Sequence, residues 1–136
     1  MGVTLGPVFD KKFPGDSLFS EYTDGKDLMF GMGRFDEICS AKGVTLFSTL
    51  AGPDEAEIEA LIAELKEGET LKDSWFSCVD GISTVSTLIN ALRTEKQWSK
   101  GFRPADVRSF ISGLEKLEEC LQLGKKKRAK FYLLCC

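Results

Sequence analysis

A long amphipathic helix pattern followed closely by a short apolar run sets the strongest limit on the fold of this chain. Pro104 suits the first turn of a helix, and apolar residues then recur every three or four positions up to Gly124, where we expect the helix to end. The run from Ala129 to Cys136 is too short for a typical helix and apolar enough for a strand buried on both faces. Such a strand needs sheet neighbours and a covering layer of helices.

Other segments can supply the neighbouring strands. Residues 3–9 predict a strand that is bent or at a sheet edge, because Pro7 cannot donate a ladder hydrogen bond. Residues 44–50 alternate β-branched and apolar side chains and also predict a strand. Residues 70–78 predict a short strand or an extended connection. Residues 11–25 contain two turn signals, so we expect a loop or a short irregular hairpin there.

Periodic apolar residues predict three more helices. The first covers residues 24–43, with Gly43 at a common stop position. Its apolar stripe comprises Leu28, Met29, Met32, Phe35, Ile38 and Cys39. The second covers residues 54–67, with Pro53 in its first turn and an acidic outer side. The third follows Asp80, which we expect to cap it.

These elements predict an α+β fold. We expect a single domain over residues 1–136, built as a two-layer sandwich in which about four helices pack on a sheet of three or four strands. Apolar residues make up 43% of the chain and charged residues 29%, which is ordinary for a globular protein and unlike a disordered one. The chain should therefore fold without a partner.

Cysteine usage and hydropathy bear on the compartment. The five cysteines are odd in number and none are spaced as C-x-x-C, so they are expected to be reduced thiols. No apolar run approaches the roughly 20 residues that span a bilayer, and the first residues lack a signal-peptide pattern. We expect a cytoplasmic protein without a membrane partner.

The chain contains no histidine. This excludes Ser-His-Asp and Cys-His nucleophile arrangements and every metal site that uses imidazole. Gly25, Gly31 and Gly33 match neither the spacing of a phosphate-binding loop nor that of a dinucleotide-binding loop. We therefore expect no enzyme, no catalytic residues, no metal and no cofactor.

Charge is unevenly distributed along the chain. Residues 1–70 carry a net charge of −8, and residues 71–136 carry +5. Within the acidic half, one flank of the helix predicted over residues 54–67 presents carboxylates that are either a solvated face or a docking site for a basic protein. These candidate partner-binding residues are Glu57, Glu59, Glu64 and Glu67.

A basic run, Lys125 to Arg128, lies at the end of the last predicted helix. Four charges in a turn are a weak nucleic-acid signal in a protein of pI near 5.1. They also complement the negative end of the preceding helix dipole. We therefore expect no nucleic-acid partner.

The helix after Asp80 carries small uncharged side chains on its non-core side. Exposed helix faces usually carry Lys, Glu or Arg, so this composition suggests that either the chain's own loop or a partner packs against it. The same face is a candidate homo-oligomer interface. Its residues are Ser83, Thr84, Ser86, Thr87 and Asn90.

Two further features concern aromatic segments: the Trp75-Phe76 to Asp80-Gly81 entry into a helix, and the closing run from Phe131 to Leu134. Together with small size, acidity and missing catalytic motifs, they make the chain resemble the small acidic α+β immunity proteins encoded beside bacterial polymorphic and contact-delivered toxins. The resemblance implies cytoplasmic neutralisation of a cognate toxin, with a basic toxin domain as partner, by direct binding and steric occlusion.

Two alternatives remain open. One is a structural or regulatory homo-oligomer, such as a homodimer, that uses the Ser83/Thr87 face. The other is a small-ligand binding protein or an enzyme without histidine, with a pocket lined by Tyr22, Cys39 or Cys78.

Overall fold

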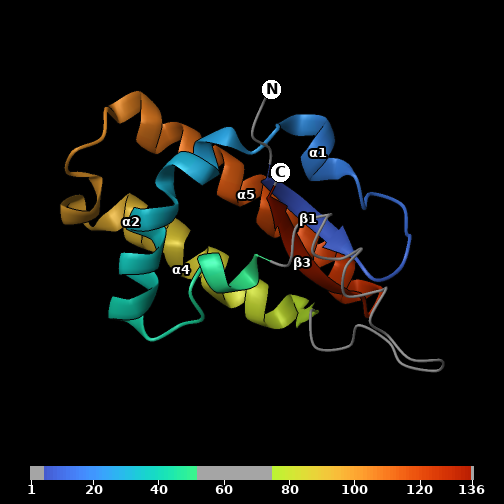
Figure 1. The fold of residues 1–136 in the computed structure, drawn as a ribbon. Coiled ribbons are helices and arrows are strands. Elements are labelled where there is room, and N and C mark those ends of the chain that lie inside the picture. Colours follow the sequence, from blue (N-terminus) through green and yellow to red (C-terminus); the bar gives the residue numbers. More distant parts are fainter. Residues whose placement is uncertain (1–4, 52–74, 136) are drawn as a thin grey trace.

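The structure is a computed structural model that describes residues 5–51 and 75–135. Helices and strands alternate irregularly along the chain, and the last strand returns to pair with the first (Figure 1). The elements are β1 (Leu5–Phe9), α1 (Leu18–Tyr22), α2 (Lys26–Lys42), the 3₁₀ helix η1 (Ser48–Leu50), β2 (Phe76–Ser77), α4 (Cys78–Thr94), the 3₁₀ helix η3 (Lys96–Ser99), α5 (Pro104–Lys126) and β3 (Lys130–Cys135).

The sheet has three antiparallel strands in the order β1-β3-β2. Pairing of β1 with β3 runs from Leu5 opposite Cys135 to Phe9 opposite Phe131. Phe131 and Leu133 have no exposed surface, and Tyr132 is also buried. The prediction of a closing strand buried on both faces is therefore confirmed, and that strand is the centre of the sheet.

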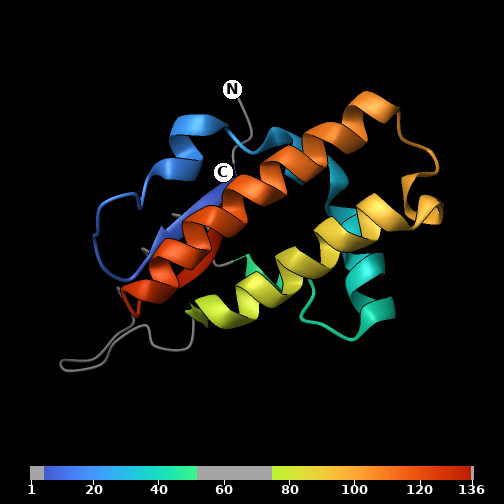
Figure 2. The ribbon, with the colours of Figure 1, turned by 180° about the vertical axis from the view of Figure 1, so that it is seen from behind.

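Helices α4 and α5 form an antiparallel pair that covers the sheet, with α2 against both of them (Figure 2). Three buried aromatic rings join α2, the turn before η1 and α5: Phe35 of α2 lies 5.3 Å from Phe47 and 5.3 Å from Phe110, in edge-to-face contact with both. The α+β prediction is confirmed, since four helices pack against a three-stranded sheet among the described residues.

Helix α2 ends where the sequence predicts. Gly43 has φ 72°, and its N–H donates to the carbonyl oxygen of Cys39. Glycine adopts this left-handed conformation without the cost that a Cβ atom imposes. The stripe side chains Leu28, Phe35 and Ile38 are all buried.

The strand predicted over residues 44–50 is wrong. The segment forms a turn and η1, in which Phe47 and Leu50 are both fully buried. Their spacing of three suits one face of a 3₁₀ helix, whereas a strand would point them to opposite faces. The carboxylate of Asp36 accepts a hydrogen bond from the Ser48 N–H at 2.9 Å, which fixes this turn.

Three smaller predictions also need correction. The hairpin considered for residues 11–25 is absent, because Phe19 enters the core from the one-turn helix α1. Asp80 is not the cap of α4; Ser77 is, and its hydroxyl oxygen accepts from the Asp80 N–H at 3.1 Å. Gly124 does not end α5, which continues to Lys126. The helix predicted over residues 54–67 lies outside the described residues.

Two helix glycines allow close contact between the helices and the sheet. A Cβ atom on Gly124 would lie 2.7 Å from the Phe9 ring and 3.0 Å from the Cys78 sulfur. One on Gly81 would lie 2.6 Å from Cε1 of Phe131 and 3.1 Å from Leu121. Since Phe131 is fully buried, its ring has no room to move away.

We expect Gly81→Ala to lower the free energy of unfolding by about 1–2 kcal/mol, because overpacking outweighs the gain in helix propensity. Gly33→Ala is the matched control, since Gly33 is also helical and a Cβ there meets nothing within 4 Å. The control should raise stability by up to about 1 kcal/mol. Urea unfolding followed by far-ultraviolet circular dichroism measures both, and equal stabilisation by the two substitutions would contradict the packing argument.

Candidate binding surface

The acidic residues favoured by the sequence for partner binding lie outside the described residues. These are Glu57, Glu59, Glu64 and Glu67, all on the predicted helix over residues 54–67. Their role in binding therefore stays a prediction. The described surface offers other candidate groups.

The uncharged face of α4 is divided between the chain's own packing and solvent. Thr84 is fully buried, and its hydroxyl donates a hydrogen bond to the carbonyl oxygen of Thr45 at 2.7 Å. Ser83 and Asn90 are exposed, and Thr87 is half-buried. Ser86 is also exposed, and its hydroxyl donates a hydrogen bond to the carboxylate of Glu118 on α5. A segment of the same chain therefore covers Thr84 and Ser86 is bonded to α5, whereas Ser83, Thr87 and Asn90 stay accessible to a second copy.

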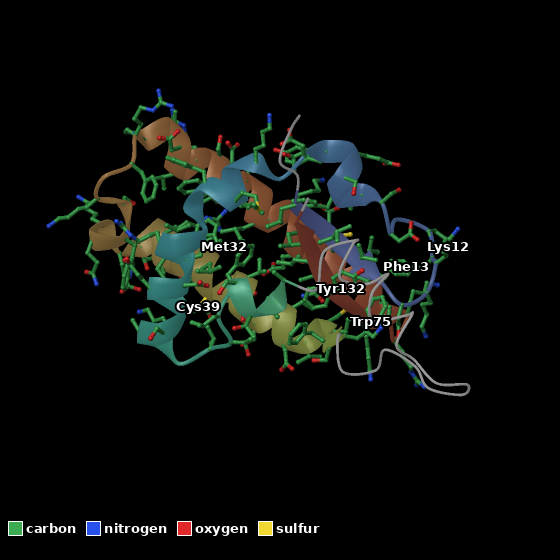
Figure 3. All side chains as sticks on the ribbon, viewed as in Figure 1. Lys12, Phe13, Met32, Cys39, Trp75 and Tyr132 are labelled. Carbon is green, nitrogen blue, oxygen red and sulfur yellow. The ribbon has the colours of Figure 1, made fainter. Side chains whose placement is uncertain are left out.

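The structure does not bring Tyr22, Cys39 and Cys78 together around one pocket. Both cysteines are buried in the core, and Cys39 lies on the C-terminal half of α2 (Figure 3). Burial raises the pKa of both thiols, that of Cys78 to about 11, because the thiolate would lose its hydration. Both thiols stay protonated near neutral pH. The clefts lined by Tyr22 contain neither of them.

An exposed aromatic group lies where α2 meets the start of α5. Phe30 is 66% exposed, and its ring packs edge-on against Phe102 with centroids 5.6 Å apart. Phe102 in turn packs edge-on against the buried Phe110 at 5.1 Å. We call Phe30, Phe102 and Phe110 the aromatic platform. Its outer ring is accessible while its inner ring is anchored in the core.

Arg34 fixes the loop that carries Phe102. Its guanidinium donates hydrogen bonds to the carbonyl oxygens of Trp98 at 2.8 Å and Lys100 at 2.9 Å, and lies 5.1 Å from the Phe102 ring centroid. It also forms an ion pair with Glu37 at 3.1 Å. Because the two carbonyls belong to η3 and the residue after it, one side chain of α2 holds the loop between α4 and α5 in place.

A polar cleft of about 460 Å³ lies beside the platform, between the start of α2 and the outer face of α5. Tyr22 lines it from the end of α1 and is 54% exposed. Asp27 and Arg108 line its two sides, and neither forms an ion pair within residues 5–51 and 75–135. Both charges are therefore available to a partner.

The cleft and the platform adjoin along α2. Asp27 and Phe30 are three residues apart, which places them on the same side of the helix. We call the residues Tyr22, Asp27, Phe30 and Arg108 the α2–α5 surface. One feature of the sequence indicates the α2–α5 surface: Phe30 is an aromatic residue outside the apolar stripe of its own helix. That Arg108 lines the same cleft as Asp27 depends on the packing of α5 against α2, which the sequence does not show.

Among the described residues, no group of three or more Cys, Asp or Glu is placed to hold a metal ion. None of the described helices is both long and apolar enough to cross a membrane. No protein-family model, curated protein or solved structure matches this chain.

We expect Arg34→Ala to lower the free energy of unfolding by about 1–3 kcal/mol and to speed hydrogen exchange in η3 and the residues just after it, because two carbonyl oxygens lose a charged donor. Glu37→Gln is the matched control: it removes the exposed ion pair, keeps both carbonyl contacts and should cost under about 0.5 kcal/mol. Denaturant unfolding and exchange mass spectrometry test this. Equal losses in the two variants would contradict the assigned role of Arg34.

Proposed function

We propose that this chain is a protein-binding module that neutralises a toxin domain by direct contact, and that the α2–α5 surface takes part in the contact. The observation that carries the proposal is Phe30, a large aromatic side chain that is 66% exposed and held by its neighbours. Aromatic and arginine side chains supply most of the binding energy at protein interfaces, and a ring already fixed in place loses little entropy on binding.

The composition of the cleft favours a protein partner over a small ligand. Small-molecule sites are concave and lined mostly by apolar groups. This cleft is instead lined by hydroxyl and charged groups, among them Asp27, Arg108, Ser109 and Ser112. A polar rim beside an exposed aromatic residue is the usual arrangement at a protein interface.

The resemblance to immunity proteins supports a toxin as the partner. On this proposal the chain covers the active site of the toxin, with Phe30 inserted into an apolar depression and with Asp27 and Arg108 paired to charges around it. The acidic residues predicted on the helix over residues 54–67 would attract a basic toxin domain over a distance and raise the association rate. Neutralisation then needs no chemistry on the chain itself.

The test starts from the C-terminal domain of the protein encoded by the gene directly upstream. Co-expression of this chain should restore the growth of cells that express that domain, and calorimetry should detect a complex of the chain with the domain. Phe30→Ser should weaken that complex by at least about 2 kcal/mol, roughly 30-fold, because a central aromatic anchor is lost. Val79→Ser is the matched control, since Val79 is 56% exposed on α4 and is not part of the α2–α5 surface. Equal affinities of the Phe30→Ser and Val79→Ser variants for the domain would contradict the placement of the α2–α5 surface in the interface.

Charge reversal tests the acidic residues of the helix predicted over residues 54–67 separately. In Glu57→Lys/Glu64→Lys/Glu67→Lys, we expect association with the same domain to slow by about tenfold or more at low salt, because the attraction between opposite charges becomes repulsion. Stopped-flow measurements at several salt concentrations give the rate. An unchanged rate and unchanged salt dependence would show that these acidic residues play no part in the association.

A further inference from the structure

The end of β1, the end of α5 and the start of β3 lie at one end of the molecule (Figures 1 and 2). The residues at and just beyond these three points include seven cations. Two hydrogen bonds join segments 120 positions apart: the Asp10 N–H donates to Lys130 O at 2.9 Å, and the Lys130 N–H donates to the Asp10 carboxylate at 2.8 Å. Figure 3 shows Lys12 on the loop at this end. We call these residues the basic end: Lys11, Lys12, Lys125, Lys126, Lys127, Arg128 and Lys130.

None of the seven cations forms an ion pair within the described part of the chain. All seven residues are exposed. Two carboxylates lie in the same segments, and both already accept hydrogen bonds from backbone N–H groups: Asp10 from Lys130 and Asp16 from Phe13. Counting these two carboxylates, the basic end keeps a net charge of +5.

The helix dipole does not explain this set of charges. It accounts for Lys125 and Lys126 in the last turn of α5. It gives no reason for Lys11 and Lys12, which follow an edge strand, or for Lys130, which begins the central one. The sequence shows only the run of four, and the fold adds the other three.

In place of the expectation from the sequence of no nucleic-acid partner, we propose that the basic end binds the phosphate backbone of a nucleic acid. Protein interfaces are depleted in lysine and depend on exposed aromatic or apolar anchors at their centre. Six of these seven cations are lysines, and the apolar residues between them, Phe13 and Ala129, are buried. Contacts to phosphate need only positive charge. A nucleic acid therefore suits this lysine-rich surface better as a partner than an acidic protein does.

A membrane surface fits less well than a nucleic acid. Lasting attachment to anionic lipid needs a second signal besides basic charge, such as an inserted apolar face. The segments that carry the seven cations, residues 10–16 and 124–130, expose no large apolar side chain, and the single exposed Val79 on the first turn of α4 is less than an inserted apolar face. The proposed contact reads no bases, since it has no feature that would enter a groove, and is therefore independent of sequence.

The test uses the full chain and fluorescein-labelled DNA duplexes of two unrelated sequences, with fluorescence anisotropy from about 50 to 200 mM salt. We expect equal affinity for both duplexes, with Kd on the order of 10⁻⁶–10⁻⁴ M near physiological salt. The plot of log affinity against log salt should have a slope of roughly −4 to −6, for five to seven phosphate contacts. This proposal does not rest on the toxin contact, which uses other side chains.

Two double variants locate the contact. Lys11→Glu/Lys12→Glu should weaken DNA binding about tenfold or more at low salt and flatten the salt slope by about 2. Lys96→Glu/Lys100→Glu is the matched control, since it makes the same charge change at two lysines without ion pairs in the described residues. These lysines lie around η3, at the opposite end of the molecule (Figure 1). The control should leave the DNA affinity and the salt slope almost unchanged.

Several results would overturn the proposal. One is the absence of DNA binding at about 50 mM salt. Another is an equal loss of DNA affinity in both double variants, since binding would then depend on the total charge of the chain and not on the basic end. Tighter binding of the same chain to poly-glutamate would assign the basic end to an acidic protein. Tighter binding to phosphatidylserine vesicles would assign it to a membrane surface.

Discussion

Burial of β3 is the constraint on which the rest of this structure depends. The strand pairs with β1 on one side and β2 on the other, and its ring at Phe131 fills the space that Gly81 leaves on α4. Because Phe131, Tyr132 and Leu133 are buried on both faces of the strand, this part of β3 must find its partners within the chain. The short edge strands, the glycines in the covering helices and the tight turn after α5 all serve that requirement.

The sequence predicts the parts of this fold that have a clear period or a conformational marker. Apolar spacing identifies α2, α4 and α5, and Gly43 marks the end of α2 because its backbone needs positive φ. The failure at residues 44–50 has a physical cause. β-Branched residues favour a strand locally, but Phe47 and Leu50 gain more by entering one core together as part of a turn held by Asp36.

Less of the candidate surfaces was predictable. Phe30 stands out in the sequence as an aromatic residue off its helix stripe. Its contact with Phe102, and the cleft that Asp27 and Arg108 line together, follow from how α5 packs against α2. The basic end shows the same limit, because Lys11 and Lys130 are brought together by strand pairing. Local patterns specify which residues are exposed more readily than which exposed residues become neighbours.

The position of β3 in the chain has a consequence for biosynthesis. The central strand is made after every other element described here, so β1 and β2 leave the ribosome with no partner between them. The α4–α5 pair can assemble early from contacts that are close in sequence, whereas the sheet must wait for contacts between distant segments. During that interval β1 carries Pro7, which cannot donate a ladder hydrogen bond, and this limits pairing of the nascent strand with other chains.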